Sequence, residues 1–140
     1  MTSATLSPGS SKVKFRLAGG AQPLILLPIH VNGGGPFDFI LDTGTSTTVI
    51  TPELAKELGV ETSSVGAGTT GGAPVDVHAG TLPSFQLGGA KIDNMAVVVA
   101  NFFEMLSAAV GAKLDGIVGY NFLRNYKVVI DYPGGNLTLF

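Results

Sequence analysis

One short segment of the sequence combines the residue types that acid–base chemistry needs. Residues 39–46 read Phe-Ile-Leu-Asp-Thr-Gly-Thr-Ser, so an apolar run delivers one carboxyl group, Asp42, into a turn with a hydroxyl group on each side of a glycine. A carboxylate can activate water as a general base, and a protonated carboxyl beside it can serve as the general acid. Like charges a few ångströms apart do not both ionise readily, so such a pair shares one proton. The segment alone is a weak signal, and it fits hydrolysis by activated water only where a second carboxyl is supplied.

The second carboxyl is expected from a second copy of the chain. An Asp-Thr-Gly or Asp-Ser-Gly triplet arises by chance in about one chain in twenty of this length, and this sequence contains it once. Asp38, Asp115 and Asp131 lack a following hydroxyl–glycine pair, and we expect them to cap turns or face solvent. A two-lobed enzyme would need about twice this length. A symmetric homodimer is implied, with its twofold axis between two Asp42 side chains.

Composition predicts one mostly β domain. The chain has 140 residues, 45% of them apolar, with 20 glycines and 8 prolines between short apolar runs. We assign residues 1–11 to a flexible lead-in and residues 12–140 to the domain. A charged fraction of 13% and a net charge of −2 argue against nucleic acid or a membrane surface as partners. There is no cysteine, and two histidines alone make no metal cluster.

Nothing in the sequence fixes where the protein resides. The apolar run at residues 24–29 is too short to span a membrane, and residues 1–11 lack the apolar core of a signal peptide. Hydrophobic patterning and turn residues predict a helix that starts at Pro52 after a Thr51 N-cap and ends before Gly59. They also predict short helices at residues 102–110 and 121–124, and strands at residues 12–17, 24–31, 37–41, 74–78, 85–87, 92–99, 127–131 and 137–140.

Three motifs together make the sequence resemble the retropepsin-like aspartic proteases, most closely the bacterial single-domain aspartyl proteases. The first is the apolar strand into Asp-Thr-Gly-Thr, followed by Val-Ile-Thr-Pro-Glu-Leu-Ala at residues 49–55. The second is Asp-Gly-Ile-Val-Gly-Tyr-Asn-Phe-Leu at residues 115–123, and the third is Val-Val-Ile-Asp-Tyr at residues 128–132 with a closing hairpin to Phe140. They occur in the order and at the spacing of the family, and the likeness covers residues 24–140.

The resemblance implies a closed, barrel-like β fold with one or two short helices and a flap hairpin. It also implies an endopeptidase without a cofactor, in which Asp42 is catalytic and an extended peptide lies across the groove as an added strand. The resemblance assigns support of the active-site loop to Thr43, Gly44 and Thr45. It assigns the flap, which contacts substrate, to Thr69, Thr70, Gly71, Gly72 and Ala73. Structural support of the site falls on Ile117, Val118 and Gly119.

Within the loop, each residue has its own expected task. The resemblance suggests that Thr43 bonds the loop of the partner copy across the dimer axis. Gly44 lets the backbone turn sharply and approach its twin, where a Cβ would crowd the site. Thr45 is expected to donate to the Asp42 carboxylate, which stabilises the charged form and favours activity on the acidic side. Retroviral members usually have alanine at that position, and many family flaps carry an aromatic residue where this one has Thr-Gly-Gly-Ala.

Other functions fit the sequence less well. A catalytically silent member of the same fold, acting as a dimerisation or peptide-binding module, stays open as the alternative. Phosphoryl transfer through an aspartyl nucleophile lacks the lysine and the α/β pattern that it would need. His30 and His78 have no acid and serine arranged around them. Residues 66–71 match Gly-x-Gly-x-x-Gly, but no helix pattern follows to bind a pyrophosphate.

Overall fold

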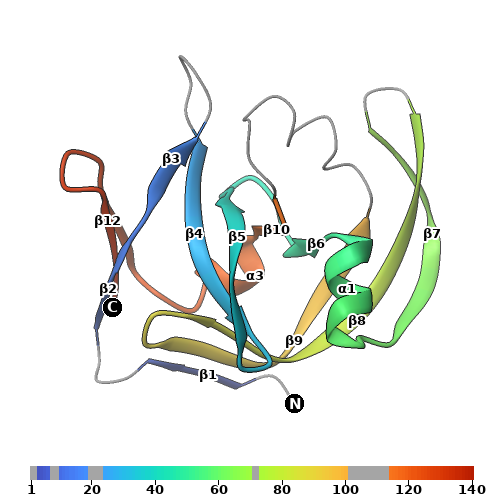
Figure 1. The fold of residues 1–140 in the computed structure, drawn as a ribbon, viewed down its shortest axis with the longest axis horizontal. Coiled ribbons are helices and arrows are strands. Elements are labelled where there is room, and N and C mark those ends of the chain that lie inside the picture. Colours follow the sequence, from blue (N-terminus) through green and yellow to red (C-terminus); the bar gives the residue numbers. More distant parts are fainter. Residues whose placement is uncertain (1–2, 7–9, 19–23, 71–72, 101–113) are drawn as a thin grey trace.

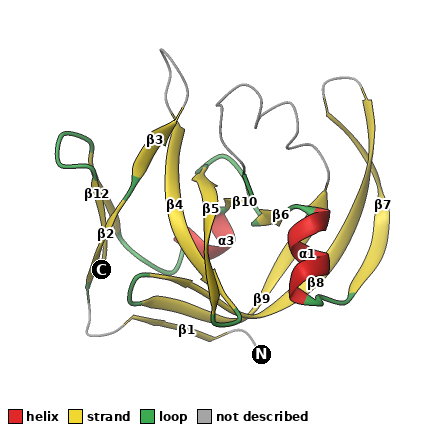
Figure 2. Cartoon of the chain, in the orientation of Figure 1, coloured by secondary structure: helices red, strands yellow, loops and turns green. Residues whose placement is uncertain are grey.

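The computed structural model describes residues 3–6, 10–18, 24–70, 73–100 and 114–140, and this part of the chain is mostly β (Figure 2). The mostly β class predicted from the sequence is confirmed. Two short helices, α1 (Pro52–Leu58) and α3 (Tyr120–Leu123), accompany the strands. The strands are β1 (Ser3–Leu6), β2 (Ser11–Lys14), β3 (Arg16–Ala18), β4 (Leu24–Val31), β5 (Gly34–Leu41), β6 (Val49–Ile50), β7 (Thr62–Thr70), β8 (Ala73–Leu87), β9 (Ala90–Ala100), β10 (Gly116–Val118), β11 (Val128–Asp131) and β12 (Asn136–Leu139).

Six strands form a closed circuit of hydrogen-bonded neighbours around the core. The order runs β9, β6, β10, β5, β4 and β8, and β8 pairs back to β9. Strands β1, β7 and β3 extend this sheet from β9, β8 and β4, while β11, β12 and β2 form a second sheet (Figure 1). Inside, the rings of Phe39, Phe85 and Phe122 pack edge to face with centroids 5.5 and 5.2 Å apart. The core is therefore continuous from the sheet to helix α3.

The predicted strand at residues 12–17 is divided between the two sheets. β2 pairs with β12, and β3 pairs with β4. The change occurs at Phe15, whose buried side chain enters the core and whose N–H donates to the Gly135 carbonyl (3.0 Å). The two sheets diverge at this point, so the chain pairs with β12 before Phe15 and with β4 after it.

The predicted strands at residues 74–78 and 85–87 are parts of one strand, β8, which pairs with β7 over its first half and with β9 from Val77 onward. Gly80 makes this continuous path possible. A Cβ at Gly80 would lie 3.0 Å from the Val60 side chain and 3.1 Å from the Glu61 carbonyl oxygen. β8 can therefore pass close to the segment that follows α1.

Helix α1 begins and ends as its sequence signals predict. The Thr51 hydroxyl accepts from the Leu54 N–H (3.1 Å), and Gly59 closes the helix in the left-handed conformation (φ +67°). The helix predicted at residues 121–124 is present as α3, one residue earlier. The helix predicted at residues 102–110 lies outside the described residues.

Residues 3–6, which belong to the segment expected to be a flexible lead-in, form β1 and pair with β9 along their whole length. Tyr126 holds this strand from the other side, since its hydroxyl donates to the Thr5 carbonyl (2.9 Å). Burial raises the pKa of the Tyr126 hydroxyl, so it keeps the proton that it donates. The lead-in thus contributes a strand to the main sheet.

Strand β10 fits between β5 and β6 because Gly116 has no side chain. A Cβ there would overlap the Phe39 ring and would lie 2.5 Å from the Val49 carbonyl oxygen. We predict that Gly116→Ala lowers the free energy of unfolding by about 1–3 kcal/mol, as overpacking of a filled core does. Urea unfolding at fixed protein concentration measures this loss.

Gly34→Ala is the matched control, because the nearest atom to its Cβ would be the Val31 carbonyl oxygen at an ordinary 3.6 Å. The control should stay within about 0.5 kcal/mol of the parent chain. Equal stability of the two variants would contradict the packing argument.

Candidate active site

Asp42 lies directly after β5, and its carboxylate is held by donors from its own loop. The Gly44 N–H donates to Oδ1 (2.9 Å), and the Thr45 hydroxyl donates to Oδ2 (2.9 Å). The Thr45 N–H also donates to the Asp42 carbonyl (3.3 Å), which closes the turn. The predicted bond from Thr45 is therefore present. Each carboxylate oxygen has one donor and keeps lone pairs for water or another carboxyl.

Strand β10 supports this loop through the backbone. It runs parallel to β5 and antiparallel to β6, and the Val118 carbonyl accepts from the Asp42 N–H (3.3 Å). Gly119 then passes so close to the loop that a Cβ would lie 2.7 Å from the Thr47 carbonyl carbon and 2.8 Å from the Thr48 nitrogen. Beyond Gly119, the Tyr120 N–H donates to the Thr45 carbonyl (2.7 Å). The predicted support residues thus meet the loop.

Two residues of the site, Thr48 and Asn121, were not singled out from the sequence. The Asn121 side-chain oxygen accepts from the Thr48 N–H (2.9 Å) and from the Thr48 hydroxyl (2.8 Å). The same hydroxyl accepts from the Gly119 N–H (3.0 Å), and the Asn121 amide donates to the Ala96 carbonyl on β9 (2.8 Å). Thr48 is fully buried, so this network fixes the end of the loop to α3 and β9. The signal available in the sequence was a hydroxyl-bearing residue, Thr48, directly before the apolar pair Val49 and Ile50.

A small apolar cluster separate from the main core includes the residues beside the loop. Ile40, two residues before Asp42, packs with Leu26 from β4 and Ile117 from β10, together with Val49, Ala100 and Leu114. These side chains are buried, so they pack the strand that delivers Asp42 against its neighbours β4 and β10.

Two of the remaining aspartates take the roles expected of them, whereas Asp115 is buried instead of capping a turn or facing solvent. The Asp131 carboxylate accepts from the Gly134 N–H (3.0 Å) and caps the last turn. Asp115 is buried, and its carboxylate accepts from the Asp38 N–H (3.2 Å), while Asp38 pairs with Arg16. Each of the three has its own partner in the structure. None of the hydrogen bonds found among the described residues joins them to Asp42.

The other residues singled out from the sequence lie as follows. Thr69 pairs with Pro74 and Thr70 with Ala73, so β7 and β8 form a hairpin where the flap was predicted, while Gly71 and Gly72 lie outside the described residues. Residues 66–70 are strand, which agrees with rejecting a dinucleotide loop. His30 on β4 lies opposite Gln86 of β8, and His78 on β8 lies opposite Val99 of β9. Thr43 lies at the exposed tip beside Gly44, and its bond to a partner copy stays a prediction.

Two further searches concern the described part of the chain. Within it, no group of three or more histidine, cysteine, aspartate or glutamate side chains is arranged to hold a metal ion. Neither helix found in those residues has the length and apolar character needed to cross a bilayer.

Comparison with known proteins gives one family and several similar structures. Residues 27–122 match the family model described as aspartyl protease. No curated protein matches the chain. The fold is similar to a retropepsin-like aspartic protease from Rickettsia conorii, at a TM-score of 0.64 and 21% identity, over 99% of this chain and 92% of that one.

Two more solved structures share the fold. The retroviral protease-like domain of Ddi1 from Leishmania major has a TM-score of 0.57 and 19% identity, over 83% of this chain and 87% of that one. EIAV protease complexed with the inhibitor HBY-793 has a TM-score of 0.53 and 19% identity, over 78% of this chain and 93% of that one. At these identities the likeness concerns the fold, whereas the family model covers more than half of the chain. The chain therefore belongs to the aspartyl protease family and has the retropepsin-like fold.

Proposed function

We propose that this protein is an aspartic endopeptidase that works as a symmetric homodimer, with one Asp42 from each copy. One observation carries the proposal: the Asp42 carboxylate is exposed on a strand-end turn, with one donor on each oxygen, from Gly44 and Thr45. Those donors fix the orientation of the carboxylate and leave lone pairs on both oxygens that can accept from a water molecule. A single carboxylate cannot also supply the acid, so the site needs a second one.

In the proposed reaction the two carboxyl groups share one proton. The ionised Asp42 takes a proton from water while the water oxygen bonds to the peptide carbonyl carbon. The protonated Asp42 of the other copy donates to the carbonyl oxygen, giving a neutral tetrahedral diol. Breakage of the carbon–nitrogen bond sends the proton of the first Asp42 to the amine nitrogen, while the other Asp42 takes a proton from a diol hydroxyl as the new carboxyl group forms, so the pair again holds one proton.

The β7–β8 hairpin supports an extended peptide as the substrate. A peptide that lies along a strand gains backbone hydrogen bonds at every second residue, and alternate side chains enter pockets. Substrate binding therefore covers the carboxylates and removes them from bulk water.

Replacement of the base gives the first test. Asp42→Asn should lower kcat for a peptide library about a thousandfold or more, because the amide can neither accept the proton from water nor donate it onward. Asp93→Asn is the matched control, since Asp93 is an exposed carboxylate paired with Lys91 on β9. Cleavage by Asp42→Asn at the rate of the control would remove the chemistry from Asp42 and favour a silent peptide-binding module.

Substitution of Thr45 tests whether its hydrogen bond to the Asp42 carboxylate contributes to the rate. Thr45→Val keeps the shape of the side chain but loses the donor to Oδ2, and we expect kcat to fall about tenfold or more with little change in KM. Thr45→Ser keeps the hydroxyl and should recover most of the loss. Equal rates for the valine and serine variants would show that packing at Thr45 matters instead of its hydrogen bond.

Dilution tests whether two copies share the site. Activity per chain should fall as protein concentration drops through the dimer dissociation constant, because active sites then form by mass action. Sedimentation velocity on the same samples should show the dimer fraction falling in parallel. Full activity at concentrations where only monomer sediments would rule out a site built from two Asp42 residues.

A further inference from the structure

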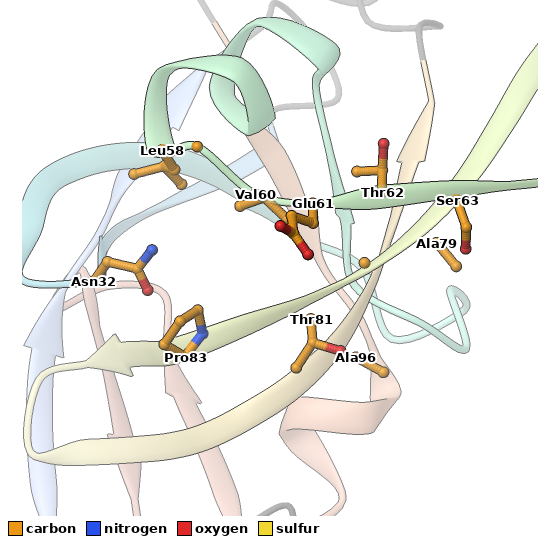
Figure 3. A pocket seen from close by; sticks show the side chains of 12 residues that line it. Asn32, Leu58, Val60, Glu61, Thr62, Ser63, Ala79, Thr81, Pro83 and Ala96 are labelled. Carbon is orange, nitrogen blue, oxygen red and sulfur yellow. The ribbon is translucent and has the colours of Figure 1, made fainter.

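A groove lies at the base of the flap hairpin, on elements separate from the Asp42 loop. It has a volume of about 770 Å³ and is lined by the end of α1, the segment that joins α1 to β7, and the middle of β8 (Figure 3). Ala96 of β9 and Asn32 of the β4–β5 turn complete the wall. Its size is within the range of sites that hold small molecules, so a single long side chain fits inside it.

Three backbone features build this groove. Gly59 ends α1 in the left-handed conformation and turns the chain toward β7. Gly80 lets β8 approach Val60 and Glu61 to within contact distance, so the two walls meet at the bottom. Asn32 has φ +52°, and its side chain accepts from the Ser84 N–H (3.2 Å) while its N–H donates to the Ser84 carbonyl (3.2 Å). The walls are therefore fixed by the fold.

The lining combines an apolar surface with one negative charge. Leu58, Val60 and Pro83 contribute apolar atoms, and Asn32, Thr62, Ser63 and Thr81 contribute polar groups. Glu61 is the only ionisable side chain among the described residues that line the groove, and its carboxylate projects between the walls (Figure 3). Such a surface fits an aliphatic stem that ends in a cation, as in arginine or lysine.

The groove is open to solvent. This openness favours a ligand that is tethered nearby over a free small molecule. Free small molecules bind well where most of their surface is buried. A side chain that belongs to a chain already held nearby is present at an effective concentration in the millimolar range, so a weak site still contributes. An open groove of this chemistry therefore suits part of a larger substrate.

We propose that this groove is an exosite that binds an arginine or lysine side chain from a protein substrate, at a distance from the scissile bond. The proposal rests on the proposed peptidase function and adds a preference for substrates with a basic residue outside the catalytic cleft. An intrinsic dissociation constant of ~1 mM against an effective concentration of ~5 mM gives about a sixfold gain in apparent affinity. The gain enters KM, because the groove does not touch the reacting atoms.

Binding is tested first, without catalysis. The probe is acetyl-Ala-Ala-Arg-Ala-Ala-amide, titrated into the full ¹⁵N-labelled chain, with the citrulline peptide as the neutral isostere. We expect the largest amide shifts at Glu61, Gly80 and Thr81, a dissociation constant in the low millimolar range, and at least threefold weaker binding of citrulline. Equal shifts from the two peptides, or shifts confined to other surfaces, would overturn the proposal.

Charge-matched variants then test the carboxylate. Glu61→Gln should weaken binding of the arginine probe about threefold to tenfold, in line with a partly exposed ion pair. Glu57→Gln removes the same charge from an exposed site on α1 outside the groove and should bind the probe like the parent chain. Equal losses in both variants would mean that general negative charge attracts the probe, which contradicts a specific site.

Kinetics test the assignment to a substrate. A cleaved core peptide is extended by flexible linkers of three, six or nine residues, which reach at most about 10, 20 or 30 Å, and each linker ends in arginine or citrulline. At one linker length the arginine form should show a KM about three to six times lower than the citrulline form, with the same kcat. The ratio of the citrulline KM to the arginine KM should approach one in Glu61→Gln and should keep its parent value in Glu57→Gln.

The two experiments separate failure of the exosite from failure of the peptidase. Probe binding without a KM gain at any linker length would overturn the assignment to a substrate side chain. Failure of the parent chain to cleave any peptide would count against the proposed function, while the binding experiment would still decide whether the groove takes a basic side chain.

Discussion

Strand β10 fits between β5 and β6 because two glycines remove the side chains that would hold these segments apart. Gly116 lies against the Phe39 ring and the Val49 carbonyl, and Gly119 lies against the backbone of Thr47 and Thr48. Only with both contacts does the Val118 carbonyl reach the Asp42 N–H, and the Tyr120 N–H reach the Thr45 carbonyl. The position of the carboxylate therefore depends on backbone packing that tolerates almost no added atom.

A partly buried polar network, centred on the buried Thr48, extends the same constraint to the rest of the barrel-like sheet. Thr48 and Asn121 satisfy each other and also bind the Gly119 N–H and the Ala96 carbonyl. Loss of either side chain would leave buried donors or acceptors without partners, which costs about 1–3 kcal/mol for each group. The network therefore joins the Asp42 loop to β9, and Ala96 of β9 also lines the groove at the base of the β7–β8 hairpin.

Local chemistry explains what the sequence predicts well. The bond from Thr45 to Asp42 spans three residues, and the cap from Thr51 to Leu54 also spans three, so turn and helix rules suffice for both. The class of the fold follows from short apolar runs between glycines and prolines. The retropepsin-like resemblance follows from motifs whose glycines, including Gly116 and Gly119, have the steric roles found in the structure.

The features that the sequence does not reveal depend on distant partners. The Thr48–Asn121 pair spans 73 residues, and nothing within either segment identifies the other. The break at Phe15 arises because β12 and β4 compete for one stretch of chain. β8 continues through Gly80 and Pro83, which normally end strands, because β9 pairs with it from Val77 to Leu82 and again from Ser84 to Leu87. In each case tertiary pairing overrides the local pattern.

The exposure of Asp42 in a single copy links chemistry to assembly in the proposed dimer. Alone, the carboxylate faces water, where its interactions are weak, and the donors found on it among the described residues, the Gly44 N–H and the Thr45 hydroxyl, are not acids that could protonate a leaving amine. Association would bring the second carboxyl, cover the loop tips and lower the local dielectric in one step. The acid, the base and the water-poor environment that strengthens both would then appear together, so an isolated chain would be inactive even though its loop is already in place. A preformed loop in turn lowers the cost of assembly, because little needs to be ordered when two copies meet.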